Sequence, residues 1–144
     1  MANFPFLTPG KVVIILRGRF AGKKAIIVKV FEGTMERKFG HALVAGIERP
    51  PEKVTRAMDK KKIEKRSRCK PFVKFVNLRH IMPTRYHVDI DVKSVVKAAD
   101  MAPEAKSTAR KEAKKSLKEL FAKRYLSKHG NNPGIKFFYT KLRF

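Results

Sequence analysis

Hydrophobic and polar positions along the first fifty residues follow the pattern of a small β-sheet. A β-branched run from Val12 to Ile15 comes directly after the turn signal Pro9-Gly10 and predicts a first strand. Two more apolar stretches, Ala25 to Phe31 and His41 to Ile47, predict a second and a third strand. Because the first two runs are apolar at nearly every position, we expect strands that are buried on both faces, or a tightly curled sheet.

A basic segment separates these strands from the next ones. Pro50-Pro51 ends the first unit, and the residues from about 49 to 74 predict an insertion, an extended loop that contains a short helix. A fourth strand is expected from Pro71 to Leu78, and a short fifth strand around His80 to Met82. Sheet and insertion together occupy residues 1–100 of the predicted α+β fold.

The last third of the chain changes to a helical period. Apolar residues recur every four positions from Ala105 to Tyr125, which predicts a basic amphipathic helix within residues 101–130. We expect Asp100 to cap the start of this helix and Gly130 to end it. Residues 131–144 combine aromatic and basic side chains, and they predict an extended tail whose aromatic rings pin it to the domain.

The net charge of the chain indicates the kind of partner that it binds. The chain has 35 Lys and Arg against 12 Asp and Glu, a formal net charge of +23 over 144 residues. Residues 49–74 alone carry eleven basic and three acidic groups. So large an excess repels itself in a compact state, so an anionic polymer is the expected partner. The basic block is also compatible with a nuclear-import signal or with a solvated run of charge.

Several classes of protein are excluded by what the sequence lacks. Its apolar runs fall far short of the about 20 residues that a membrane-spanning helix needs, and we expect no secretory signal and no membrane partner. Cys69 is the single cysteine, which excludes an internal disulfide and favours an intracellular setting. Asp89 and Asp91 share a face of a predicted strand, but no third ligand completes a metal site. We therefore expect no enzyme, no metal site and no cofactor.

The most specific local pattern lies between the first two strands. It comprises Gly10-Lys11, a glycine-bounded loop from Gly18 to Gly22 with Arg17 and Arg19, and the pair Lys23-Lys24. Glycines let such a loop approach a phosphate closely, while the rigid strands aim its basic side chains. The hairpin resembles the KOW motif, a short segment of SH3-like barrels in ribosomal proteins and transcription elongation factors. A hairpin that is basic only for solubility is the alternative.

Ordered blocks along nearly the whole chain strengthen the resemblance and make it more specific. Together they resemble the eukaryotic large-subunit ribosomal protein family numbered twenty-seven. The blocks are Pro9 to Val13, Gly22 to Ala25, His41 to Ile47, Lys60 to Ile63, Met82 to Tyr86 and Lys141 to Phe144.

The resemblance implies a fold, a function and a place in the cell. The fold is a small SH3-like β-barrel with a basic insertion loop, a C-terminal helix and an extended tail. The function is that of a structural constituent of the large subunit of the cytosolic eukaryotic ribosome, bound to ribosomal RNA and to neighbouring ribosomal proteins. Location is expected in the cytoplasm, with nuclear or nucleolar transit during assembly. Neither enzymatic activity nor a homo-oligomer is expected.

The basic residues expected to bind RNA lie in the hairpin, the insertion, the segment after Pro83-Thr84 and the tail. They would contact phosphates and release counterions rather than read bases. Beside them, Tyr86 is compatible with a stacking role or with a place in the core. The expected RNA-binding residues are Lys11, Arg17, Arg19, Lys23, Lys24, Arg56, Lys60, Lys61, Lys62, Lys65, Arg66, Arg68, Lys70, Arg85, Lys141 and Arg143.

Two other functions remain open at this point. One is a KOW-type transcription or chromatin-associated factor that binds nucleic acid, which would usually carry additional domains. The other is a protein-binding SH3-like adaptor, which would keep its partner after nuclease digestion.

Overall fold

Five antiparallel strands form one sheet in the part of the chain that the computed structural model describes, residues 4–102, 105–127 and 132–143. The order of the strands is β4-β3-β2-β1-β5, so β4 and β5 are the edges of the sheet. With three α-helices around it, this sheet confirms the predicted α+β class. The elements are β1 (Lys11–Ile15), β2 (Lys24–Phe31), β3 (His41–Arg49), α1 (Lys60–Ser67), β4 (Lys70–Asn77), β5 (Ile81–His87), α2 (Ser107–Leu126) and α3 (Pro133–Tyr139), with short 3₁₀ turns at Leu78–His80 and Ala99–Met101.

Both faces of the central strands are buried, as their uninterrupted apolar runs predict. Successive residues alternate between two hydrophobic clusters, because side chains of a strand point to opposite faces in turn. In β2, Ala25 and Ile27 belong to one cluster and Ile26 and Val28 to the other. In β3, Leu43, Ala45 and Ile47 belong to the same cluster as Ile26 and Val28, so they share one face as predicted.

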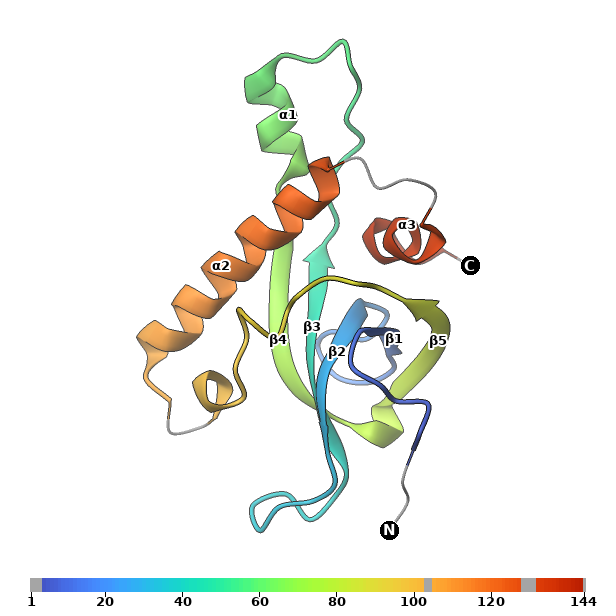
Figure 1. The fold of residues 1–144 in the computed structure, drawn as a ribbon, viewed down its shortest axis with the longest axis vertical. Helices are drawn as coiled ribbons and strands as arrows, with labels where there is room; N and C mark the ends of the chain where they lie inside the picture. The colour runs from blue at the N-terminus through green and yellow to red at the C-terminus, as the bar shows by residue number, and fades with distance from the viewer. Residues whose placement is uncertain (1–3, 103–104, 128–131, 144) are drawn as a thin grey trace.

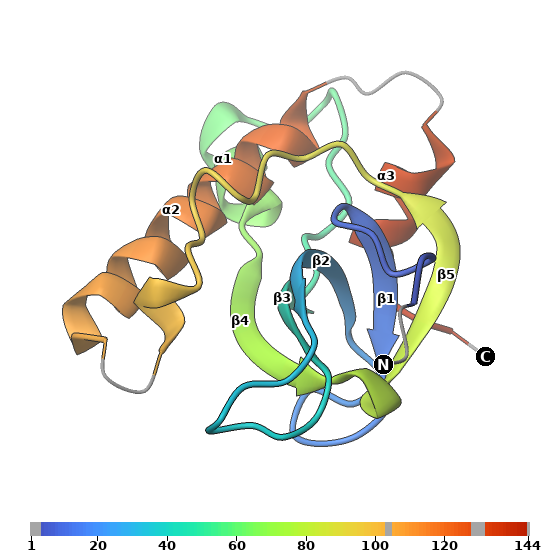
Figure 2. The same cartoon turned by 60° about the horizontal axis from the view of Figure 1, so that its bottom comes forward.

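The two hydrophobic clusters lie on opposite faces of the sheet and are covered by different parts of the chain. The inner core fills the curl of the sheet, which Figure 2 shows, and the helix-side core lies between the sheet and the C-terminal helices. The inner core contains Leu7, Val13, Ile15, Phe20, Ala25, Ile27, Ala42, Val44, Phe72, Val76 and Ile81. The helix-side core contains Val12, Ile26, Val28, Leu43, Ala45, Ile47, Cys69, Val88, Ile90, Val92, Val96, Leu117, Phe121, Ile135, Phe138 and Tyr139.

Helix α2 crosses the molecule beside β4, and α3 lies on the side of β5 (Figures 1 and 2). The four-residue stripe predicted for this helix is confirmed, because Ala113, Leu117 and Phe121 are its buried residues. The ring of Phe121 meets that of Phe138 in α3 edge to face, with 5.4 Å between the centroids. The two helices therefore cover the sheet together.

The predicted start of this helix is wrong. Helix α2 begins at Ser107, and Asp100 lies in a 3₁₀ turn rather than at a cap. The chain first crosses the helix-side core, where Val92 and Val96 are buried, and this path delays the helix. The predicted stop at Gly130 lies outside the described residues.

The predicted extended tail is also wrong for half of its length, because α3 occupies its centre. The side chain of Asn132 caps this helix by accepting a hydrogen bond from the Gly134 amide at 3.0 Å. Pro133 suits the first turn, where its missing amide proton has no partner to lose. Burial of Phe138 and Tyr139 confirms that aromatic rings pin this segment to the domain.

The fifth strand is longer than predicted. It pairs with β1 through Pro83, opposite Val13, and continues to His87. Proline is tolerated there because β5 is an edge strand, where the missing amide proton costs no bond to a further strand.

The basic insertion stands at one end of the long axis of the molecule, opposite the β2–β3 hairpin (Figure 1). Its short helix is confirmed as α1, from Lys60 to Ser67. The Glu52 amide donates to the Arg66 carbonyl at 2.9 Å, which ties the incoming loop to the end of this helix.

Gly46 lies where β3 is closest to its neighbours. A Cβ atom at this position would lie 2.5 Å from Phe72 Cζ and 2.6 Å from the Lys24 carbonyl oxygen. We therefore expect Gly46→Ala to lower the free energy of unfolding by about 1–3 kcal/mol, measured by urea denaturation. At Gly33 the nearest atom would be 3.6 Å away, so Gly33→Ala is the control. Equal losses in the two variants would contradict this packing.

Candidate nucleic-acid interface

The β1–β2 hairpin presents two arginines on a rigid base. Its loop closes through two backbone bonds, from the Ile15 amide to Lys23 and from the Gly22 amide to Ile15. Gly18 and Gly22 have φ values of 94° and 77°, which glycine adopts without strain. Arg17 and Arg19 are exposed on this loop.

Phe20 anchors the same loop in the inner core. Its ring stacks on that of Phe72 with 4.1 Å between centroids and an angle of 6°. The Arg19 guanidinium lies 4.8 Å from the centroid of the Phe20 ring, a cation–π contact that orders the arginine at the surface. The hairpin can thus present Arg19 to an anion in a defined position.

The paired lysines at the start of β2 have opposite environments. Lys23 is half-buried, and no interaction of its side chain occurs among the described residues. Lys24 is only 5% exposed, and its ammonium donates to the carbonyls of Phe137 and Thr140, both at 2.7 Å. The ammonium also lies 3.8 Å from the centroid of the Phe137 ring. Lys24 therefore holds the end of α3, and its ammonium points into the fold rather than toward solvent.

The buried position also changes the acid–base chemistry of this lysine. Desolvation lowers the pKa of the Lys24 ammonium below its ordinary value. The two carbonyl oxygens replace the lost water, because the last carbonyls of α3 have no partner within the helix. The alternation of side chains along β2 indicates this burial, because Lys24 lies on the same face of the strand as Ile26 and Val28 of the helix-side core.

Helix α1 and the loop before it carry the densest set of accessible cations. Five of the expected RNA-binding residues are exposed, and their side chains have no interaction with another described residue. Because the helix stands away from the sheet in Figure 1, these cations can reach a polyanion without a change in the fold. They are Arg56, Lys60, Lys61, Lys62 and Lys65.

Three other cations of the insertion are paired with carboxylates. Arg68 contacts Glu64 at 3.0 Å, one helical turn earlier, and Lys70 contacts Glu48 at 3.2 Å. Both pairs are exposed, so each contributes little to stability and can be exchanged for a phosphate.

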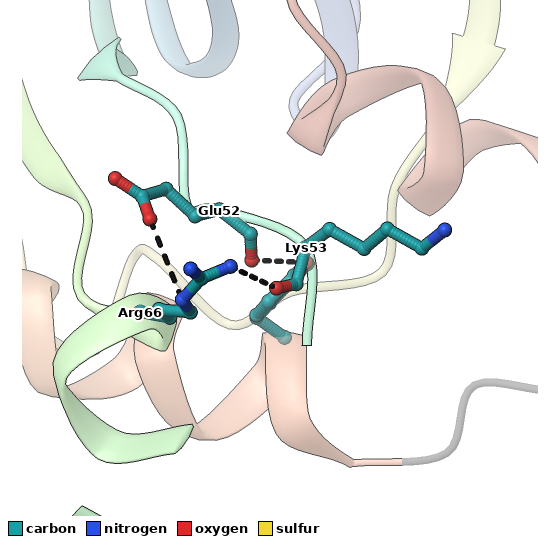
Figure 3. Close-up of polar contacts among 4 residues, drawn as sticks. Glu52, Lys53 and Arg66 are labelled. Carbon is teal, nitrogen blue, oxygen red and sulfur yellow. Dashed lines mark hydrogen bonds and ion pairs between the residues drawn. The ribbon is translucent and has the colours of Figure 1, made fainter. Parts of the chain in front are cut away.

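Arg66 is the third paired cation, and its contacts organise the loop. Its Nε atom lies 3.7 Å from Glu52, and its Nη1 atom donates to the Lys53 carbonyl at 3.3 Å, as Figure 3 shows. Arg66 thus positions the 52–53 segment, a role that its place in a basic run does not reveal.

The edge of the sheet holds two more of the expected residues. The Lys11 ammonium donates to the Thr84 carbonyl at 3.3 Å. Arg85 is exposed, and its Nη2 atom donates to the Tyr86 hydroxyl at 3.1 Å. The Tyr86 ring stacks on Phe137 with 4.6 Å between centroids, so its ring packs against the tail.

A groove beside the tail brings together residues that are distant in the sequence. Lys141 and Arg143, both expected to bind RNA, line it with Lys53 and Lys136. The sequence analysis missed Lys53 and Lys136. The helical period of α3 places Lys136 away from buried Ile135 and Phe138, a signal that an extended tail does not carry.

Two other kinds of feature are absent from the part of the chain that the structure describes. Among the described residues, no group of three or more His, Cys, Asp or Glu could hold a metal ion. Within those same residues, no helix has the length and apolar character needed to span a bilayer. Asp91 instead accepts a hydrogen bond from the Ser94 amide at 3.4 Å in a turn.

Comparison with known proteins gives matches over nearly the whole chain. Residues 12–144 match the ribosomal L27e protein family. The large ribosomal subunit protein eL27 of Tetrahymena thermophila is 52% identical over 145 residues, which cover 96% of this chain and 98% of the relative. The protein of that name from Pisum sativum is 52% identical over 141 residues, with the same two coverages. Large ribosomal subunit protein eL27z of Arabidopsis thaliana is 50% identical over 140 residues, which cover 96% and 97%.

Replacement of Lys24 tests its role in the fold. Lys24→Met keeps the aliphatic stem but removes two charge-assisted hydrogen bonds, so we expect the free energy of unfolding to fall by about 2 kcal/mol. Lys23→Met is the matched control and should change it by less than about 0.5 kcal/mol. Urea denaturation at neutral pH measures both. An unfolding free energy unchanged in Lys24→Met would show that the tail does not depend on this lysine.

Cys69 should be unreactive in the folded protein. The side chain is 3% exposed, and burial raises the pKa of its thiol from 9.0 to about 11. The shift alone leaves about a hundredfold less thiolate at pH 8, and the thiolate is the reactive form. We expect reaction with a disulfide reagent at pH 8 to be slower than that of the urea-unfolded chain by at least this factor. Similar rates would contradict the buried position.

Proposed function

This chain belongs to the ribosomal L27e protein family, as the ordered blocks of its sequence predict, and on that premise we propose that it binds ribosomal RNA as a structural constituent of the large ribosomal subunit. It acts as a non-enzymatic component. Its partners are large-subunit RNA and neighbouring ribosomal proteins. We place it in the cytoplasm, on ribosomes, after nuclear or nucleolar transit during assembly.

The single observation that carries the RNA proposal is the set of exposed cations without a carboxylate partner. Arg17 on the hairpin, Arg56 and the lysines of α1 have no interaction with another described residue. Unpaired cations keep their full charge available to phosphate, and each contact releases condensed counterions. Their spread over a hairpin, an insertion and a tail suits a folded RNA that surrounds the protein.

The finer description of the fold belongs to the same proposal. We assign residues 1–100 to an SH3-like barrel whose β1–β2 hairpin is a KOW motif. In support, the five strands curl around the inner core, and the inner strand β1 pairs with both β2 and β5. Under the same proposal, the region 101–130 contributes the amphipathic helix and 131–144 the aromatic-basic tail.

The expected RNA-binding residues divide into three groups under this proposal. Lys24 and Arg66 are assigned to holding the fold. Lys11, Arg68, Lys70 and Arg85 have internal partners at exposed or half-exposed positions, which a phosphate can replace. The direct contacts are assigned to Arg17, Arg19, Lys23, Arg56, Lys60, Lys61, Lys62, Lys65, Lys141 and Arg143.

Salt dependence of RNA binding tests the mechanism. With about 6 phosphates contacted, the affinity for structured large-subunit RNA should fall on the order of a thousandfold between about 50 and 200 mM salt. Lys61→Gln with Lys62→Gln should lower the slope of log affinity against log salt by about 2. Fluorescence anisotropy measures both.

Two exposed lysines in the nearly neutral stretch before α2 provide the matched control. Lys93→Gln with Lys97→Gln removes the same charge and should leave the slope close to that of the unmodified protein. A flat salt response, or equal slopes in the two double variants, would contradict an RNA site at α1.

A further inference from the structure

A groove of about 880 Å³ lies between three segments of the chain. Its walls are the 50–53 segment, the end of α2 and the stretch from Asn132 to Arg143, which includes α3. The volume lies at the upper end of the range of about 300–1,000 Å³ that is typical of ligand sites. It is therefore a concave surface of a size that admits part of an extended chain.

The described lining of this groove carries four cations and no carboxylate. Lys53, Lys136, Lys141 and Arg143 line it, and none of the four side chains interacts with another described residue. The nearest acidic residue in the sequence is Glu52, whose carboxylate is paired with Arg66 at 3.7 Å. Figure 3 shows the Glu52 and Lys53 side chains pointing in opposite directions, as successive residues of an extended segment do. The groove thus concentrates positive charge.

The walls of the groove are held in place independently of any ligand. The Tyr125 hydroxyl donates to the Glu52 carbonyl at 3.1 Å, which joins the end of α2 to the 50–53 segment. The Tyr139 hydroxyl donates to the Phe121 carbonyl at 2.8 Å, which joins α3 to α2. On the remaining side, Lys24 holds the Thr140 carbonyl. A strand entering the groove therefore meets preorganised cations.

We propose that this groove binds an unpaired segment of RNA by its phosphates, an inference that rests on the proposed function and assigns one site within it. A duplex presents its phosphates on a convex surface and cannot enter a concave site of this size. An unpaired strand can, and non-specific sites for single strands combine a basic groove with aromatic side chains. The half-buried Tyr125 supplies an aromatic ring in this lining, whereas Tyr139 belongs to the helix-side core behind it.

A charge-matched pair of variants of the full chain tests the groove. Lys53→Gln with Lys136→Gln removes two groove cations, and Lys93→Gln with Lys97→Gln removes two exposed lysines outside the lining. The probes are a fluorescent single-stranded octanucleotide and the duplex of the same sequence. For the single strand, we expect the slope of log affinity against log salt to fall by about 2 in the groove variant and to stay near the unmodified value in the control. For the duplex, the two variants should behave alike.

The outcomes separate this inference from the function on which it rests. An unmodified protein that binds no RNA overturns both. A different outcome overturns only the groove proposal. In that outcome the affinity of the unmodified protein depends steeply on salt, but the slopes for the single strand are equal in the two variants. If the groove variant does not fold, ultraviolet cross-linking of the octanucleotide to the unmodified protein decides instead. Cross-links in peptides from 50–53 or 132–143 support the groove, and cross-links only elsewhere overturn it.

An acidic protein segment is the other occupant that such charge could attract. A poly-glutamate peptide with the same number of charges as the octanucleotide is therefore the competitor. We expect the RNA strand to bind the unmodified protein more tightly than this peptide, because only RNA adds bases that can meet the partly exposed ring of Tyr125. Equal or tighter binding of the peptide, lost in the groove variant, would assign the groove to a protein partner and overturn the proposal.

Discussion

Burial of the sheet on both faces is the constraint on which the rest of the structure depends. The strands alternate between the inner core and the helix-side core, so neither face can be left to water without exposing a continuous apolar surface. The inner face is covered by curling the sheet on itself. The other face needs α2 and α3, which is why the C-terminal third packs against the sheet rather than extending from it.

The same constraint determines where the charge can lie. With both faces of the central strands committed to the core, most of the net charge of +23 lies at exposed positions of the loops, the insertion, α2 and the tail. Among the described residues Lys24 is the buried exception, and it is accommodated because the carbonyls of Phe137 and Thr140 at the end of α3 replace its hydration. The distribution of cations around an apolar interior thus follows from packing, and it produces a surface suited to a polyanion.

Features with a strong local period could be predicted from the sequence, and features that depend on distant contacts could not. The strands and the buried stripe of α2 follow from alternation and from four-residue spacing. Helix α3 was missed because its seven residues gain stability from the helix-side core, through Phe138 and Tyr139, more than from propensity. In the site, the accessible lysines of α1 follow from composition. The separate roles of Lys23 and Lys24, and the positioning role of Arg66, depend on partners 12 or more residues away.

The central claim is that exposed cations meet RNA while buried Lys24 holds the fold. The most direct test is lysine methylation followed by mass spectrometry, on the free protein and on purified large subunits that contain it. The account predicts that Lys60, Lys61 and Lys62 react when free and are protected in the subunit, and that Lys24 is protected in both. Lysines of α1 that stay fully reactive in the subunit, or a Lys24 that reacts in the free folded protein, would contradict it.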